Sequence, residues 1–291
     1  MKKTILSTLV GCSMFALPLA ASVAGQIGYL GPAGSWTHQA CLDLFGPADL
    51  VPLTRDDLFK GYQSGKIERA CVPVTTSVVG VTPYLDAVLD LPDVTIVAEY
   101  PKMLGYSLLA KPGTKLADVT EVLAHPVAFE EVKPWVDREM PKVKRTEAAS
   151  GGAAAKTVAD SPGHDKASFG PKVGASVYSL VSLVDGIEQG PHNVTRWWVL
   201  GRAMPAPTGR DKTSLLVDAS DDTLNGALAA LITAKVPVLT IYERPSKKTL
   251  DTHRYVIEVA GHARQEPLAS VLAAQPGMRV LGSYPRQASP R

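Results

Sequence analysis

The feature that most constrains the fold is an order of strand, polar turn and helix that recurs along the first two hundred residues. An apolar run at 26–30 is followed by a turn rich in Gly, Ser and Thr at 31–37, and then by a helical pattern at 39–45. Successive units of this kind give parallel strands, because a parallel partner is reached only through a crossover such as a helix. We therefore predict an α/β fold with a parallel sheet and crossover helices.

Hydroxyl side chains follow several of the predicted strands. Open α/β sheets bind ligands beyond the carboxyl ends of their strands, and a helix N-terminus presents N–H groups and a positive dipole end to an anion. These turns indicate an anion site, while helix capping by Ser and Thr stays open as the structural alternative. The residues concerned are Ser35, Thr37, Thr76, Ser77 and Ser150.

The stretch 193–200 places a hydroxyl and a guanidinium at the start of a strand. Arg196 offers a planar fork of donors suited to a carboxylate, and the neighbouring Thr195 hydroxyl can contact the same molecule. An anionic organic substrate fits this pair, although Arg196 is equally consistent with a structural ion pair at a strand end. Trp197 and Trp198 are expected on opposite faces, because successive strand residues alternate.

The first 24 residues have the pattern of a cleaved export signal. Lys2 and Lys3 precede a mostly apolar run at 5–21 and small residues at 22–24. We expect a periplasmic or secreted protein that begins near Gly25. Lipoprotein processing at Cys12 is the second alternative and a retained membrane helix the third.

Charge and cysteine content give little further information about function. Without Lys2 and Lys3, Lys+Arg falls from 30 to 28 and equals Asp+Glu at 28, so a polyanionic partner such as nucleic acid has no support. Cys41 and Cys71 fit either one disulfide or two buried thiols. No Cys/His spacing indicates a metal site.

A second kind of module follows a linker at 205–211 that contains two Pro and one Gly. Its predicted order is βαββαβ, the ferredoxin-like arrangement. Such a module more often binds a small regulator or another copy of itself than carries out chemistry. The predicted elements are strands at 212–217, 238–243, 254–259 and 278–284, and helices at 223–234 and 266–274.

Five segments together resemble the signature of the prephenate dehydratase family, and the chain from 212 onward resembles the ACT regulatory domain. The segments are 31–34, 73–80, 125–126, 150–156 and 193–197. The resemblance implies a catalytic domain at 25–204 with a two-lobed, periplasmic-binding-protein-like fold, followed by an ACT-like domain at 212–291. Lobe 1 would comprise about 25–103 and 186–204, and lobe 2 about 104–185.

The implied activity is that of a carbon–oxygen lyase of L-phenylalanine biosynthesis. It converts prephenate to phenylpyruvate with loss of water and carbon dioxide, and requires no metal or organic cofactor. L-phenylalanine is the implied regulator, and a homodimer or a larger even oligomer the implied assembly.

The resemblance also assigns roles to residues. Thr195 would donate to the leaving hydroxyl, and Arg196 would hold the local frame or a carboxylate. Substrate-binding positions would be Ser35, Thr37, Thr76, Ser77, Ser150 and Trp197. Positions for the regulatory ligand would be Asn225, Gly226, Ala227, Leu228, Glu243 and Arg244.

The chain departs from the family pattern at several polar positions. Thr75-Thr76-Ser77 stands where the family has Glu-Asn-Ser, Val127 and Glu131 replace two glutamines, and Gly151-Gly152 replaces Thr-Ala. One alternative is therefore a non-catalytic binding or sensor protein that uses the same cleft for an aromatic or keto acid. Another is a related cyclohexadienyl acid as substrate, with Trp36 and Glu131 reshaping the pocket.

Overall fold

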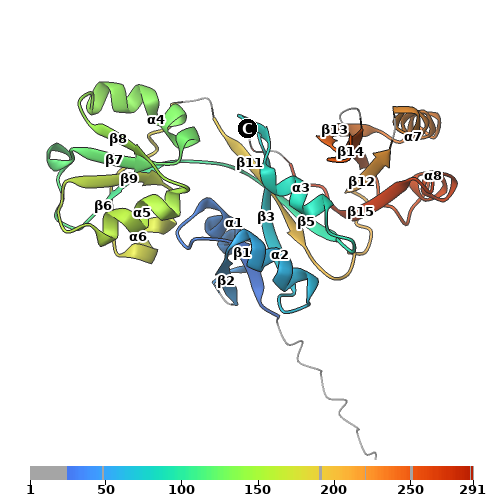
Figure 1. Ribbon diagram of the computed structural model, residues 1–291, viewed down its shortest axis with the longest axis horizontal. Coiled ribbons are helices and arrows are strands. Elements are labelled where there is room, and N and C mark those ends of the chain that lie inside the picture. Colours follow the sequence, from blue (N-terminus) through green and yellow to red (C-terminus); the bar gives the residue numbers. More distant parts are fainter. Residues whose placement is uncertain are drawn as a thin grey trace, which may run out of the picture.

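The computed structural model describes residues 25–288 and 290, apart from 48, 190, 191, 220, 250 and 251. The predicted export signal lies outside these residues. Three bodies follow one another along the long axis, with lobe 1 between lobe 2 and the C-terminal module (Figure 1). Among the described residues, none of the helices combines the length and apolar character that crossing a bilayer requires.

Lobe 1 is built on a mixed sheet in the order β2-β1-β3-β11-β5, with the short strand β4 (Gly80–Val81) paired to β3. Strands β1, β2 and β3 are parallel as predicted, but β11 runs antiparallel to both neighbours because it returns from lobe 2. The elements are β1 (Ile27–Leu30), α1 (Trp36–Phe45), β2 (Leu50–Leu53), α2 (Arg55–Gln63), β3 (Arg69–Thr76), α3 (Pro83–Leu89), β5 (Ile96–Met103) and β11 (Val194–Leu200).

Strand β3 extends through Thr75 and Thr76, so that Thr76 ends the strand and does not lie in a turn after it. Both threonines pair with β11 on one side and with β4 on the other. These ladders satisfy the backbone groups of the two threonines, which the local sequence does not reveal. The hydroxyl cluster therefore begins inside the sheet.

Lobe 2 has a second mixed sheet in the order β10-β6-β9-β7-β8. Helix α4 begins at Pro126, because proline fits the first helical turn and His125 caps the helix. The elements are β6 (Ser107–Ala110), η1 (Leu116–Asp118), β7 (Glu121–Ala124), α4 (Pro126–Glu139), β8 (Lys144–Glu147), α5 (Gly151–Asp160), β9 (Lys166–Gly170), α6 (Val173–Tyr178) and β10 (Val181–Asp185).

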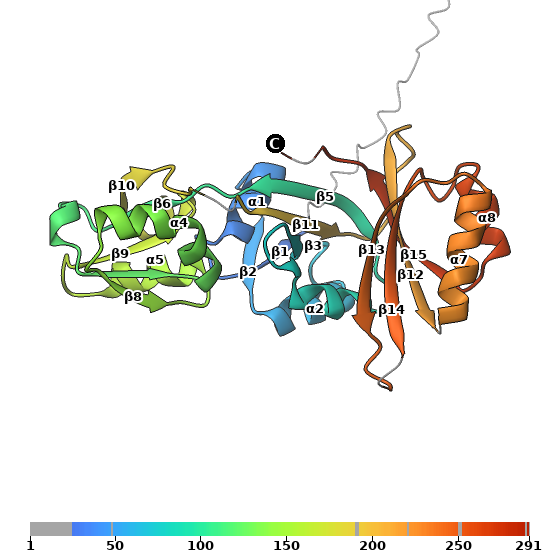
Figure 2. The same ribbon diagram turned by 90° about the horizontal axis from the view of Figure 1, so that it is seen from above.

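The C-terminal module confirms the predicted βαββαβ order. Its antiparallel sheet has the order β13-β14-β12-β15, and both helices cover one face (Figure 2). The elements are β12 (Asp211–Ala219), α7 (Asp221–Thr233), β13 (Val238–Pro245), β14 (His253–Ala260), α8 (Leu268–Ala274) and β15 (Met278–Pro285).

The other face of this sheet packs on lobe 1. Leu216, Val256 and Leu281 belong to the same buried cluster as Trp198 and Leu200 of strand β11. The module therefore shares a hydrophobic core with lobe 1 and packs directly against β11, the strand that returns from lobe 2.

Gly282 sets the distance between the module and lobe 1. A Cβ atom built at this residue would lie 2.1 Å from the carbonyl oxygen of Ile96 in β5. We predict that Gly282→Ala lowers the free energy of unfolding by about 1–3 kcal/mol, because the backbone of one strand has to move. Chemical denaturation followed by tryptophan fluorescence measures the change.

Gly226→Ala is the matched control in the same module. Gly226 lies in helix α7 with open space around its Cβ position, so alanine there is expected to raise stability by about 0.5–1 kcal/mol. Equal stabilities of the two variants would contradict the close approach at Gly282.

Candidate active site

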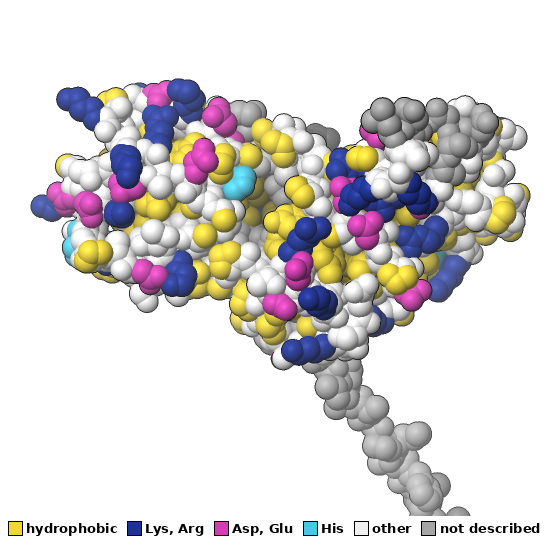
Figure 3. Space-filling view, in the orientation of Figure 1, with side chains coloured by type: hydrophobic (Ala, Val, Ile, Leu, Met, Phe, Trp, Pro, Cys, Tyr) yellow, Lys and Arg dark blue, Asp and Glu magenta, His cyan; other side chains and the backbone are white. Residues whose placement is uncertain are grey.

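A cavity of about 960 Å³ lies between the two lobes and is lined by both. Hydrophobic side chains gather on the surface at the junction of the lobes (Figure 3). Of the described residues that line the cavity, Arg55 alone carries a charge, and it lies exposed at the start of α2. The other polar lining side chains include Ser35, Thr37, Thr76, Thr82, His125, Ser150, Asn193 and Thr195, and the aromatic ones are Trp36, Tyr84, Tyr106, Phe169 and Trp197.

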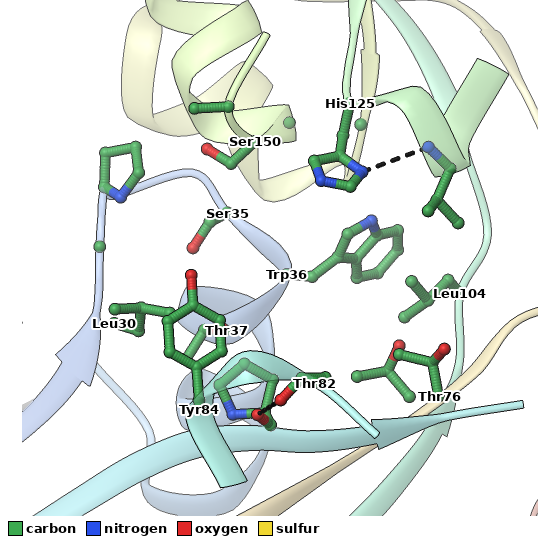
Figure 4. A pocket seen from close by; sticks show the side chains of 18 of the residues that line it. Leu30, Ser35, Trp36, Thr37, Thr76, Thr82, Tyr84, Leu104, His125 and Ser150 are labelled. Atoms are coloured by element: carbon green, nitrogen blue, oxygen red, sulfur yellow. Dashed lines mark hydrogen bonds between the residues drawn. The ribbon is translucent and has the colours of Figure 1, made fainter. Parts of the chain in front are cut away.

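Two helix N-termini meet at this cavity from opposite lobes. Ser35 caps α1 by accepting from the N–H of His38 at 3.3 Å, and Ser150 caps α5 by accepting from the N–H of Ala153 at 3.1 Å. Figure 4 shows both serines at the same end of the cavity. The two hydroxyls therefore act as caps and line the cavity, so that both helix dipoles favour an anion at this end.

The lobes touch beside these helix ends. The Tyr178 hydroxyl donates to the carbonyl oxygen of Ala33 at 2.8 Å. A Cβ atom at Gly152 would lie 2.5 Å from that same oxygen and 2.8 Å from the backbone nitrogen of Ser35. Glycine at position 152 therefore allows the two N-termini to approach this closely.

Strand β11 presents Thr195 and Trp197 to the cavity. The Thr195 hydroxyl donates to Oδ1 of Asn193 at 3.3 Å, and Nε1 of Trp197 donates to the Thr37 hydroxyl at 3.1 Å. All four residues line the cavity, and Trp198 lies in the core on the other side of the strand. The expected alternation of Trp197 and Trp198 is confirmed.

Arg196 does not line the cavity. Its Nη1 atom lies 2.9 and 2.8 Å from the two carboxylate oxygens of Glu258 in strand β14, and 3.2 Å from Oε2 of Glu99. Lys212 completes the group at 2.7 Å from Glu99, so two cations and two anions are buried together. Burial lowers the pKa of Arg196, but the charge of Glu258 outweighs it and raises that pKa above its usual value. The structural ion pair is the alternative that the structure supports.

His125 caps a helix at the cavity wall. Its Nδ1 accepts from the N–H of Val127 at 3.3 Å, the bond drawn in Figure 4. Burial lowers the pKa of His125, although the charge of Glu147 opposes this. The imidazole is therefore kept neutral beside the cavity, as an acceptor for the cap requires.

Ser77 does not line the cavity and is exposed to solvent. Its hydroxyl donates to the carbonyl oxygen of His192 at 3.1 Å and accepts from the N–H of Val194 at 2.8 Å. It thus joins β3 to the start of β11. Thr76, the neighbouring predicted residue, does line the cavity.

The six residues predicted to bind the regulatory ligand differ in their exposure and in their partners. Ala227 is buried between helix and sheet, and Leu228 is half-buried beside it. Arg244 makes a bidentate ion pair with Asp86 of lobe 1 at 2.8 Å, and Glu243 lies 2.7 Å from His253. Asn225 and Gly226 are exposed on α7.

Sequence reasoning missed Arg55, Tyr106 and Asn193 as residues of the site. Arg55 follows the carboxyl end of strand β2, where the rule for open α/β sheets would have found it. Asn193 is the first residue of the stretch that contains Thr195, but no sequence motif indicates a role for its amide group. Tyr106 lies in a connection between the lobes, and no local pattern marks it.

A two-lobed α/β domain that encloses a cavity, with a βαββαβ module docked on it, defines the class of two-lobed cleft proteins that carry an appended ferredoxin-like module. A family model for prephenate dehydratase matches residues 27–205. The chain belongs to the prephenate dehydratase family, whose members are enzymes of the lyase type.

Individual relatives match over most of their length. The prephenate dehydratase of Mycolicibacterium vanbaalenii is 30% identical, over 89% of this chain and 90% of its own. That of Corynebacterium glutamicum is 31% identical, over 85% and 82%. The solved prephenate dehydratase of Arthrobacter aurescens in complex with L-Phe is 29% identical with a TM-score of 0.81, and the match covers 90% of each chain.

The buried charge cluster predicts a non-additive pair of variants. Arg196→Met alone leaves Glu99 and Glu258 with one cation between them, and is expected to cost roughly 3–5 kcal/mol of folding free energy. The double variant Arg196→Met, Glu258→Met keeps the cluster neutral and is expected to cost less than the sum of the two single variants. Denaturant unfolding of the four proteins measures the coupling. Strict additivity would show that the two side chains do not interact.

Proposed function

We propose that this chain is a prephenate dehydratase, which converts prephenate to phenylpyruvate, water and carbon dioxide. The observation that carries the proposal is the position of Thr195. Its hydroxyl lies in the wall of a largely apolar cavity that two helix N-termini flank, and it is buried from bulk water. Membership of the family indicates prephenate as the substrate, and the cavity contains hydroxyl groups and helix N-termini that suit its carboxylates.

The reaction needs few groups because formation of an aromatic ring drives it. The bond between the ring carbon and its carboxylate breaks, carbon dioxide leaves, and the electron pair enters the ring. The bond between the ring and its hydroxyl breaks at the opposite carbon, and that hydroxyl takes up one proton and departs as water. We assign this delivery to Thr195, whose hydroxyl then turns from Oδ1 of Asn193 toward the departing group.

The cavity can hold the two carboxylates in different ways. The N-termini of α1 and α5 favour one anion, and Arg55 at the rim is a partner for an anion near the opening. Apolar walls such as Trp197 and Phe169 leave a carboxylate beside them poorly solvated, which favours its departure as neutral carbon dioxide.

L-phenylalanine is the regulator that we propose for the C-terminal module. The Arthrobacter aurescens relative was solved in complex with L-Phe. In this chain, Asn225, Gly226 and Glu243 are exposed and remain available to a ligand, whereas Arg244 is held by Asp86.

We also propose that the chain works as a homodimer joined through its C-terminal modules. Ile232 is 68% exposed and Ile241 42% exposed. Both border a hollow of about 510 Å³ between α7 and the edge strand β13. Apolar side chains beside an unpaired strand edge are a typical surface for pairing with a second copy.

Export of the mature chain remains a proposal based on the N-terminal sequence. The basic start, apolar run and small residues of 1–24 support cleavage near Gly25 and a periplasmic or secreted location.

Removal of the Thr195 hydroxyl tests the proposed reaction. The purified chain from Gly25 onward is expected to form phenylpyruvate from prephenate, and Thr195→Ala to lower kcat by roughly 10²- to 10⁴-fold, because the donor to the leaving hydroxyl is lost. Thr195→Ser should retain much of the activity. Thr157→Ala, which removes a hydroxyl on the surface of α5, is the matched control and should be unaffected. Absence of turnover by the folded wild-type chain would refute the proposal.

A charged residue at position 232 tests the proposed dimer. Ile232→Glu is expected to convert the dimer to monomers, because a charge in the centre of an apolar contact opposes burial. Sedimentation velocity measures the change. Val181→Glu, at an exposed valine of lobe 2, is the control and should remain dimeric. A dimer that persists in Ile232→Glu would place the interface elsewhere.

A further inference from the structure

Glu131 lies where the two connections between the lobes meet. The first connection, 104–106, joins β5 to β6, and the second, described at 186–189 and at 192 and 193, joins β10 to β11 (Figure 1). They are bonded to each other, since the N–H of Leu104 donates to the carbonyl oxygen of Asn193 at 2.8 Å. Helix α4 brings Glu131 of lobe 2 against both.

The carboxyl of Glu131 is fully buried and incompletely bonded. Its Oε1 accepts from the Tyr106 hydroxyl at 3.2 Å. Asn193 approaches the carboxyl with its side-chain and backbone N–H groups. Within the described part of the chain, Oε2 makes no hydrogen bond of ordinary geometry. A buried carboxyl with an open position is unusual, since such groups are normally satisfied.

The surroundings favour the neutral form of this carboxyl. Burial raises the pKa of Glu131 to about 7, and the charge of Glu188 raises it further, while bonds from Asn193 and Tyr106 oppose the change. Glu188 accepts from the backbone N–H of Tyr106 at 2.7 Å, so Tyr106 and Glu188 are the titratable groups that face Glu131. A neutral carboxyl carries one O–H donor.

Asn193 links this carboxyl to the cavity. Its Oδ1 accepts from the Thr195 hydroxyl at 3.3 Å, and its side-chain and backbone N–H groups are near enough to Glu131 to lower the pKa of that carboxyl. An amide has one acceptor end and one donor end, so the partner at one end determines which end faces the other side. Tyr106, Asn193 and Thr195 line the cavity, whereas Glu131 lies behind them.

We propose that Glu131 is a positioning residue for the dehydration, holding the Asn193 amide, and through it the Thr195 hydroxyl, toward the bound acid. This inference rests on the proposed function. The neutral carboxyl performs the role, because an ionised one would place a negative charge in a low-dielectric wall facing a substrate with two carboxylates. The family's glutamine at this position has no proton to lose, so the pH dependence belongs to this chain.

The test compares pH profiles of kcat/KM for prephenate from about pH 5 to about pH 9. The wild-type profile is expected to fall above about pH 7. Glu131→Gln, which has the same shape and no titration, should lose this fall. Glu188→Gln should keep the fall but move it to lower pH, and Tyr106→Phe should move it to higher pH, since each removes one influence on the carboxyl.

Two outcomes would overturn the inference. A Glu131→Gln profile with the wild-type fall would show that another group titrates, and unchanged profiles in both Glu188→Gln and Tyr106→Phe would show the same. Thermal unfolding with and without prephenate is measured in parallel. If the wild-type chain binds prephenate without turnover, the proposed function fails separately. In that case the role of Glu131 is tested by the affinity for prephenate, which should weaken above about pH 7 in the wild type and not in Glu131→Gln.

Discussion

The buried ion cluster around Arg196 is the interaction on which the rest of the structure depends. It joins strand β11 of lobe 1 to strand β14 of the C-terminal module, with no net charge among its four members. Buried charges are tolerated only when they are paired, so the module has to dock where Glu258 meets Arg196. Because strand residues alternate, the same constraint turns Thr195 and Trp197 toward the cavity.

Strand β11 therefore connects three parts of the molecule. One face carries the proposed proton donor, the other face carries the contact with the regulatory-type module, and its N-terminal end continues into a connection with lobe 2. Glu131 acts on the same strand from the lobe 2 side, through Asn193.

Much of the fold could be predicted from the sequence, but the assembly of the site could not. The βαββαβ module and most strands and helices follow from hydrophobic periodicity, turns and caps, which are local signals. The length of β3 and the antiparallel direction of β11 depend on pairing with distant strands. Ser35, Thr37, Thr76, Ser150, Thr195 and Trp197 line the cavity as the resemblance implied, whereas Ser77 and Arg196 do not.

The sequence by itself determined the α/β class, the succession of elements and the residue types that suit an anion, because each depends on neighbours along the chain. Tertiary structure decided which of these residues share a cavity. Arg196 and Thr195 are adjacent in sequence and point to opposite sides of a sheet, where one pairs with Glu258 and the other faces the cleft. Glu131, Asn193 and Tyr106 are far apart in sequence and meet only because two connections and a helix cross at one point.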